Sequence, residues 1–247
     1  MQKKIRIAII GAGIQGVCTA LFLQKKGFNV TLFDRDEPGN AASYGNAGHF
    51  SPYASLQLNR TDVLSDVPSM LLSSRGPLSL KWNYIPRMLP WFIKFVFNCS
   101  KIKMMHTAKY MHQILNLSLN AYDELFQDID LEGLVENNGI MYVWEKKGLK
   151  SRELEINIRN ELGVDQQILT PKEIHDLEPN IKPFYHGGVF YKSARHAKDP
   201  KKILIKLFNN FLKKDGKFLK LNIQNLNFDE KKPVIRTESQ RFIFDKL

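Results

Sequence analysis

Three closely spaced glycines follow a short apolar run near the N-terminus, and this arrangement constrains the fold more than any other part of the chain. The run, residues 5–10, is rich in isoleucine, as a buried parallel strand is, and Gly11, Gly13 and Gly16 follow it directly. In such a turn the first glycine permits tight bending, the second lets backbone approach a pyrophosphate, and the third lets the next helix pack close to the sheet. The sequence therefore predicts a strand, a phosphate-binding turn and a helix whose N-terminal N–H groups face the phosphates.

A carboxylate stands where such a unit holds a ribose. Residues 29–33 form a second apolar strand pattern that ends in Asp34, at about the 20-residue spacing where an acid accepts hydrogen bonds from ribose hydroxyls. An acid at this position disfavours a cofactor with a 2′-phosphate. Strand, glycines, helix, strand and acid in this order predict a Rossmann-type dinucleotide site.

Residues 7–23 could also imitate a signal peptide or a membrane span, because Gln15 is their only strongly polar residue and basic residues precede them. Three glycines would weaken such a helix by roughly 1 kcal/mol each relative to alanine. They do not have the G-x-x-x-G spacing of membrane helix pairs either. The Rossmann interpretation explains the glycines, and the membrane interpretation does not.

Composition places the chain among ordinary globular proteins. The 247 residues are 43% hydrophobic and 25% charged, enough for one large domain or two small ones. Cys18 and Cys99 have no metal-ligand spacing, which fits a reducing compartment, and we expect a cytoplasmic protein. The six histidines have no H-x-x-x-H or H-E-x-x-H spacing, so we expect no metal site.

A net charge of +11 raises the question of anionic partners. The lysines are scattered in short pairs without an aromatic-basic motif, so we expect no nucleic-acid partner. Weak peripheral contact with anionic lipid, such as the inner face of a plasma membrane, stays open.

Periodicity predicts the remaining elements. Residues 39–51 are rich in glycine and asparagine and predict a ligand-facing loop. Residues 77–99 predict two short helices with aromatic packing, and the apolar steps from Met104 to Ile129 predict one long amphipathic helix. Its methionines are expected in the core, with a partner-binding face as the alternative. Helices are further expected at 61–72, 149–162 and 171–177 and from Pro200 onward, and strands at 139–144, 188–191, 218–228, 234–237 and 242–244.

Six segments together resemble one known family, the flavin-dependent D-amino-acid oxidase superfamily, and within it bacterial D-amino-acid dehydrogenases. They are residues 7–36 (IAIIGAGIQGVCTALFLQKKGFNVTLFDRD), 43–52 (SYGNAGHFSP), 76–95 (GPLSLKWNYIPRMLPWFIKF), 137–145 (NNGIMYVWE), 177–191 (LEPNIKPFYHGGVFY) and 196–207 (HAKDPKKILIKL). They span most of the chain in the family's order.

The resemblance implies an α/β fold in which a Rossmann-type FAD-binding domain is interleaved with an α+β substrate domain. It places residues 1–80 in the FAD-binding domain, 81–190 mostly in the substrate domain, and 191–247 back in an incomplete FAD-binding domain. Family members continue with an Ala-Gly segment and a C-terminal part that carries further flavin contacts and a basic residue for the substrate carboxylate. The sequence is therefore expected to be the N-terminal part of such a protein.

The resemblance also assigns FAD contacts. The expected positions are Gly11, Ala12, Gly13, Ile14, Gln15 and Gly16 at the pyrophosphate, Asp34 at the ribose, Arg35 near the adenine, Ser43, Asn46, Ala47 and Gly48 along the path to the flavin, and Ile223, whose backbone would meet adenine. His49 is a candidate for contact with substrate or flavin, or an incidental loop histidine. His186 and His196 lie in family-like motifs and receive no catalytic role.

The implied activity is oxidation of the C–N bond of a D-amino acid, in which FAD takes a hydride and the resulting imino acid hydrolyses to a 2-oxo acid and ammonia. The implied partners are a D-amino acid and an electron acceptor, either a quinone or a carrier. A glycine or sarcosine-type amine oxidase is the alternative within enzymes. A non-catalytic binding module, with the Met104 to Ile129 stripe exposed to a partner, is the alternative outside them.

Overall fold

The structure is a computed structural model of the 247-residue chain, and it describes all residues except 1–3, 73–78, 146–148 and 230–231. The chain forms two compact units. The first unit comprises residues 1–50, 120–136 and 196–247, and the second comprises residues 51–119 and 137–195. The expected division into FAD-binding and substrate domains at residues 80 and 190 stays a prediction.

The first unit is built on a parallel sheet of order β1-β2-β9. β1 (Arg6–Ile10) and β2 (Asn29–Asp34) pair in parallel, joined by α1 (Ile14–Lys25), and β9 (Lys217–Lys220) pairs with the other edge of β2. The middle strand is almost fully buried, as its continuous apolar run requires. The predicted strand, turn, helix and second strand are therefore confirmed.

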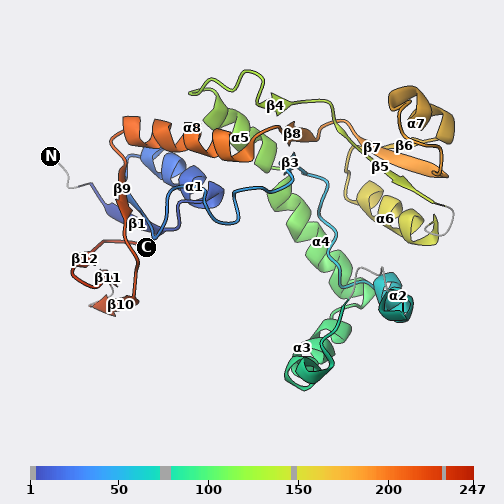
Figure 1. The fold of residues 1–247 in the computed structure, drawn as a ribbon, viewed down its shortest axis with the longest axis horizontal. Coiled ribbons are helices and arrows are strands. Elements are labelled where there is room, and N and C mark those ends of the chain that lie inside the picture. Colours follow the sequence, from blue (N-terminus) through green and yellow to red (C-terminus); the bar gives the residue numbers. More distant parts are fainter. Residues whose placement is uncertain (1–3, 73–78, 146–148, 230–231) are drawn as a thin grey trace. The chain divides into compact units, whose positions relative to one another are not determined.

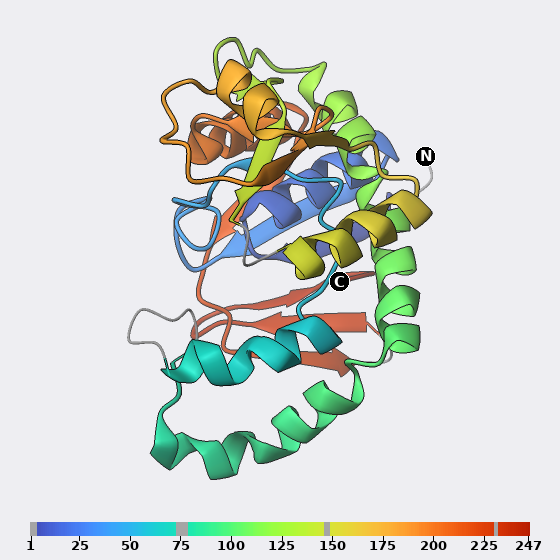
Figure 2. The same cartoon turned by 90° about the vertical axis from the view of Figure 1, so that its right-hand side faces the viewer.

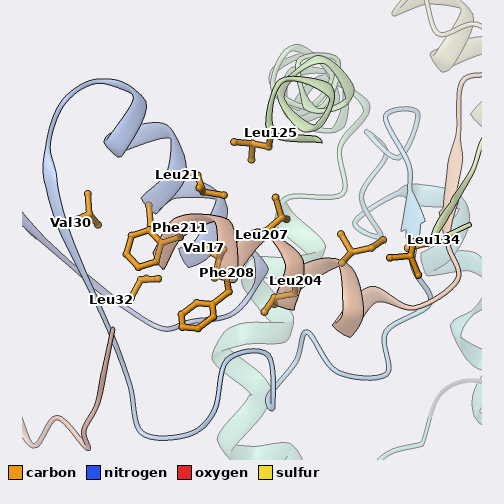
Figure 3. Packing of buried hydrophobic residues seen from close by; sticks show 13 residues of the cluster. Val17, Leu21, Val30, Leu32, Leu125, Leu134, Leu204, Leu207, Phe208 and Phe211 are labelled. Carbon is orange, nitrogen blue, oxygen red and sulfur yellow. The ribbon is translucent and has the colours of Figure 1, made fainter. Parts of the chain in front are cut away.

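The core of this unit lies between α1 and α8 (Pro200–Lys213), which run beside each other (Figure 1). Asp199 caps α8, because its side chain accepts a hydrogen bond from the Lys202 amide at 2.9 Å. The Gln24 side chain amide donates to the carbonyl oxygens of Phe211 and Lys214 at 3.1 and 2.7 Å. Figure 3 shows the buried cluster, which includes Val17, Leu21, Val30, Leu32, Leu125, Leu134, Leu204, Leu207, Phe208 and Phe211.

An antiparallel meander of β10 (Asn225–Asp229), β11 (Lys232–Arg236) and β12 (Arg241–Ile243) completes the unit, drawn in red in Figure 2. The single strand predicted at 218–228 is wrong, because β9 and β10 belong to different sheets. The chain changes partner between them. The Leu221 amide donates to the carbonyl of Asp34 at 2.8 Å, and the Gln224 amide donates to the carbonyl of Arg236 at 3.0 Å.

A small sheet of order β3-β8-β4 was not predicted. β3 (His49–Phe50) and β4 (Val135–Glu136) have two residues each and β8 (Arg195–Ala197) has three. Segments this short carry no readable alternation. The loop predicted at 39–51 is otherwise confirmed as turns and irregular backbone.

The second unit contains an antiparallel sheet of order β5-β7-β6, formed by β5 (Ile140–Trp144), β7 (Gly187–Tyr191) and β6 (Gln167–Leu169). α6 (Leu149–Glu161) and α7 (Pro171–Leu177) pack on its opposite faces, because alternate strand residues contact either Ile156 or Ile174. α7 starts with the predicted cap: Thr170 and Glu173 form a reciprocal capping box. β6 was not predicted.

Two helix predictions need correction, one at residues 77–99 and one between Met104 and Ile129. Residues 82–97 form a 3-10 turn, η1 (Trp82–Tyr84), and one 13-residue helix, α3 (Ile85–Phe97), in place of two short helices; residues 77 and 78 lie outside the described chain. Pro90 lies inside α3, where its fixed φ is compatible with the helix although it lacks an N–H donor. α2 (Thr61–Leu72) has the predicted bounds.

The single helix predicted between Met104 and Ile129 is broken into α4 (Lys101–Leu115) and α5 (Ser118–Phe126). The Leu117 amide donates to the carbonyl of Ile114, three residues back, and the Ser118 hydroxyl donates to the carbonyl of Leu115 at 2.6 Å. These local bonds replace the helical ladder at the break. Met104 is buried as predicted, whereas Met111 is 40% exposed. No described helix is long and apolar enough to cross a membrane.

Candidate functional site

The glycine turn between β1 and α1 has the backbone that its sequence predicts. Gly11 has a φ of +109°, and its amide donates to the carbonyl of Phe33 at 2.7 Å, which ties the turn to β2. A Cβ on Gly16 would lie 1.9 Å from the Gly11 carbonyl oxygen, so only glycine permits this close approach. Gly13 is the N-cap of α1, and a Cβ there would lie 3.0 Å from the Ser43 hydroxyl oxygen.

The first turn of α1 presents unused backbone donors. Within the described chain, the amides of Gln15 and Gly16 donate to no protein acceptor. No acidic residue lies in that turn to compete with an anion. Two free N–H groups and the positive end of a helix dipole suit a phosphate oxygen.

Ser43 extends the turn from a distant position in the sequence. Its hydroxyl oxygen accepts a hydrogen bond from the Ile14 amide at 2.9 Å. The structure therefore brings Ser43 to the helix N-terminus, where the sequence analysis expected a phosphate contact. The hydroxyl keeps a donor hydrogen for a further acceptor, such as a phosphate oxygen.

Asp34 has structural contacts that sequence reasoning missed. One carboxylate oxygen accepts from the Ala12 amide at 2.7 Å and the other accepts from the Asp36 amide at 3.0 Å. Each oxygen retains a further lone pair for a ribose hydroxyl. Asp34 thus joins the end of β2 to the glycine turn at the position expected for the ribose.

The rest of the expected FAD path, from Asn46 to Gly48, is organised around its own backbone. The Asn46 side chain donates to the carbonyl of Ser43 at 3.1 Å and accepts from the Gly48 amide at 2.8 Å. Gly48 has a φ of +68°, and a Cβ there would lie 2.4 Å from the carbonyl oxygen of Ala197. Ala47 is exposed. Asn46 therefore shapes this loop, and its side chain is already engaged within it.

His49 lies next to His196, a pairing that the sequence analysis did not anticipate. The two rings are edge to face with centroids 5.4 Å apart. His49 is exposed on β3 and His196 is half-buried on β8. The small sheet β3-β8-β4 brings them together, so no motif of the linear sequence could have indicated the pair. His186 is exposed and belongs to the second unit.

Arg35 and Ile223 complete the predicted set. Arg35 is exposed directly after Asp34. Ile223 was predicted in a strand, but it lies in the irregular connection between β9 and β10. Its side chain is half-buried against a cluster that contains Phe33 and Ile235. The chain leaves the parallel sheet after Leu221, whose amide still bonds to β2, and this explains why the strand prediction failed at Ile223.

These residues fit the diphosphate and adenosine portions of a dinucleotide such as FAD. The fit rests on the space that a Cβ would fill at Gly13, on the two free amides of α1 and on the carboxylate of Asp34. Among the described residues, no group of three or more His, Cys, Asp or Glu is placed to hold a metal ion.

Comparisons with known proteins bear on the family of the chain and on its fold. The family described as FAD dependent oxidoreductase (DAO) matches residues 6–244. The D-amino-acid oxidase of Bradyrhizobium diazoefficiens is 31% identical over 237 residues, which cover 95% of this chain and 56% of that protein. D-amino acid dehydrogenase 2 of Ralstonia nicotianae is 28% identical over 215 residues, which cover 83% of this chain and 49% of that protein. The chain thus spans about half the length of the curated relatives it matches.

A solved structure, glycine oxidase from Geobacillus kaustophilus, has the same fold. It superposes with a TM-score of 0.64 at 15% identity and covers 98% of this chain and 54% of that one. The predicted α/β class and the family resemblance are therefore confirmed.

Proposed function

This chain belongs to the FAD dependent oxidoreductase family, DAO, and on that premise we propose that it is the FAD-holding part of an enzyme that oxidises the C–N bond of D-amino acids. The cofactor of its family is FAD, as the sequence analysis expected. The substrate class is supported by two relatives named for D-amino acids, with identity spread over most of this chain.

The observation that carries the cofactor part of the proposal is the free N-terminus of α1. The amides of Gln15 and Gly16 would hold pyrophosphate oxygens, with the Ser43 hydroxyl beside them. Asp34 would accept from the ribose hydroxyls through its remaining lone pairs. Backbone amides and the Ser43 hydroxyl would therefore hold the phosphate oxygens.

Bound FAD supplies the hydride acceptance that this reaction requires. The substrate loses a hydride from its α-carbon and a proton from its amino group, and water then converts the imino acid into a 2-oxo acid and ammonia. His49, exposed on β3, is the candidate of this chain for contact with substrate or flavin. His196 would orient it through the ring contact.

The test is anaerobic mixing of the reconstituted protein with amino acids, followed by the visible flavin absorption. We expect D-alanine to bleach the flavin and L-alanine to leave it unchanged. Bleaching by glycine or sarcosine alone, with peroxide formed under air, would favour the amine oxidase alternative. A flavin-loaded protein that no amino acid bleaches would favour a non-catalytic binding module. If the reduced flavin is reoxidised rapidly by a quinone and only slowly by oxygen, the enzyme is a dehydrogenase.

The proposal includes peripheral contact with an anionic membrane surface, such as the inner face of the plasma membrane, through α3. Trp91 and Phe97 on α3 are 54% and 71% exposed, and Arg87 and Lys94 lie on the same helix. Residues 67–122 contain seven Lys or Arg and no Asp or Glu. Exposed aromatic side chains within a basic stretch of sequence are typical of helices that lie in a lipid interface.

The membrane contact predicts a salt-sensitive association. Vesicles containing anionic lipid should sediment the protein at low ionic strength, whereas neutral vesicles should not. Association with both kinds of vesicle alike, or with neither, would contradict this part of the proposal.

A further inference from the structure

We propose that the second unit contains a separate ligand site, a cavity beside α6 that binds a small aromatic monocarboxylate. The cavity has a volume of about 160 Å³. Its walls include Tyr53, Tyr142, Trp144, Arg152, Arg159 and Tyr191. All its lining residues belong to the second unit, so the site does not rest on the proposed function.

One wall of the cavity is positively charged. Arg152 and Arg159 both line it, and they share the carboxylate of Glu155, at 3.0 and 3.1 Å. Glu155 is only 7% exposed and also pairs with Arg60 at 2.9 Å. One carboxylate thus serves three guanidinium groups at the edge of a cavity, an arrangement that an added anion would stabilise.

The two lining arginines also retain donors. Arg152 reaches Glu155 through Nη1 alone, and Arg159 uses Nη1 for Glu155 and Nε for the carbonyl of Tyr53 at 3.4 Å. Within the described chain, neither Nη2 group has a hydrogen-bond partner. An arginine fork with unused N–H groups is suited to a carboxylate.

The remaining walls of the cavity are mainly aromatic. Tyr53 and Tyr191 stack with centroids 3.8 Å apart, and Tyr142 reaches the Tyr53 hydroxyl at 3.1 Å. The guanidinium of Arg159 lies 5.6 Å from the centroid of the Tyr191 ring. These walls favour the ring of a ligand in edge-to-face or stacked contact.

Trp144 supplies a second, independent sign of a ligand. Its side chain lines the cavity and is 8% exposed, and its indole Nε1 has no hydrogen-bond partner among the described residues. A buried indole N–H usually has an acceptor. A purely structural role for the ion pairs of Glu155 would explain how α6 is joined to Arg60. It would not explain why the indole N–H of Trp144 lacks an acceptor.

The volume limits the ligand to one ring. An engineered apolar cavity of about 150 Å³ in another protein binds benzene, so a single ring with a short carboxylate arm matches the space and the charge. A nucleotide would be too large, and a small aliphatic dicarboxylate would leave the aromatic walls without a ring to contact.

The test is calorimetric titration of the 247-residue chain, without added FAD, with phenylacetate and with the uncharged isostere phenylacetamide. We expect phenylacetate to bind and phenylacetamide to bind at least about tenfold more weakly, because the amide forfeits the charged hydrogen bonds. Equal affinity for both, or no binding of phenylacetate by the folded chain, would overturn the proposal.

Two variants locate the site. Arg152→Gln should weaken phenylacetate binding by about tenfold or more. Lys172→Gln, which also removes one positive charge but at an exposed position on α7 that does not line the cavity, should leave binding unchanged. Leu56→Trp, which keeps every charge and fills the cavity, should abolish binding even if the arginine variant fails to fold. Unchanged binding in folded Leu56→Trp, or binding that needs FAD, would contradict the assignment.

Discussion

The carboxylate of Asp34 accepts a hydrogen bond from the backbone amide of Ala12 with 2.7 Å between the heavy atoms. This bond links the last residue of β2 to the turn that precedes α1, 22 positions earlier in the chain. The residue expected to bind ribose therefore also sets the conformation of the turn expected to bind pyrophosphate. Substitution there should affect both stability and cofactor binding.

Asp34→Asn should lower the free energy of unfolding by about 1–2 kcal/mol, because a neutral amide replaces a charged acceptor of two backbone bonds. It should also weaken FAD binding through the loss of ribose contacts. Chemical denaturation and FAD titration measure the two effects. Asp128→Asn, at an exposed pair with Lys214, is the control and should change neither by much. Wild-type values for Asp34→Asn would count against both roles.

Gly16→Ala should prevent the native turn from forming. The added Cβ would lie 1.9 Å from the Gly11 carbonyl oxygen. Both atoms are fixed to the backbone of the turn, so the clash cannot be relieved by rotating a side chain. Gly27→Ala provides the matched control, because Gly27 has a φ of +84° and open space around its Cβ, so we expect only about 1–2 kcal/mol of backbone strain. Thermal unfolding followed by circular dichroism distinguishes them. Similar melting temperatures for both variants would contradict the close approach.

Glu155→Gln should destabilise the second unit by about 3 kcal/mol, because it leaves buried guanidinium groups without their carboxylate. The pH dependence has a defined direction. Burial raises the pKa of Glu155, but three arginines lower it by more, so the net pKa lies below its ordinary value.

The stabilisation from Glu155 is therefore complete above the ordinary glutamate pKa of about 4.3 and is lost as pH falls through the lower pKa of the folded state. Urea unfolding between pH 7 and pH 3 measures this, and Glu155→Gln should lack that part of the decline. Parallel pH profiles for the two proteins would show that the carboxylate does not act as described.

Cys18 should be unreactive in the folded protein. Burial within α1 raises the pKa of its thiol to about 12, so almost no thiolate exists at neutral pH. Because the unfolded thiol ionises near pH 8.5, the contribution of Cys18 to stability should fall as pH rises above that value. Alkylation followed by peptide mass spectrometry should label Cys18 only after denaturation. Rapid labelling of Cys18 in the native protein would contradict this prediction, because it would show that α1 opens readily.

Local rules predicted the elements whose signals lie within a few residues. Gly11 and Gly16 specify their turn through backbone geometry. Thr170 and Asp199 each start a helix through a side-chain capping bond to the amide three residues later. The bond from the Ile14 amide to Ser43 joins residues 29 positions apart, and no pattern in the sequence indicates it. The same is true of the ring contact between His49 and His196, which depends on strands of two and three residues.

Apolar periodicity was also misleading in two places. It runs through the break at residues 116 and 117, because helices before and after a break can bury the same side. It likewise runs from β9 into β10, although the backbone changes partner from β2 to β11. Apolar periodicity indicates which side chains are buried. Where a helix or strand ends depends on its backbone hydrogen-bonding partners, which can be distant in the sequence.

Titration of the 247-residue chain with FAD, followed by quenching of flavin fluorescence, tests the central claim most directly when wild type is compared with Gly13→Ala. Gly13 has a φ of −77°, which alanine adopts readily, so the variant should fold while its methyl group, 3.0 Å from the Ser43 hydroxyl oxygen, blocks the approach of a pyrophosphate. We predict that wild type binds FAD and that Gly13→Ala, with an unchanged circular dichroism spectrum, loses at least about tenfold in affinity. Equal affinity in the two proteins, or no binding by a folded wild-type chain, would contradict the assignment of this turn as the FAD site.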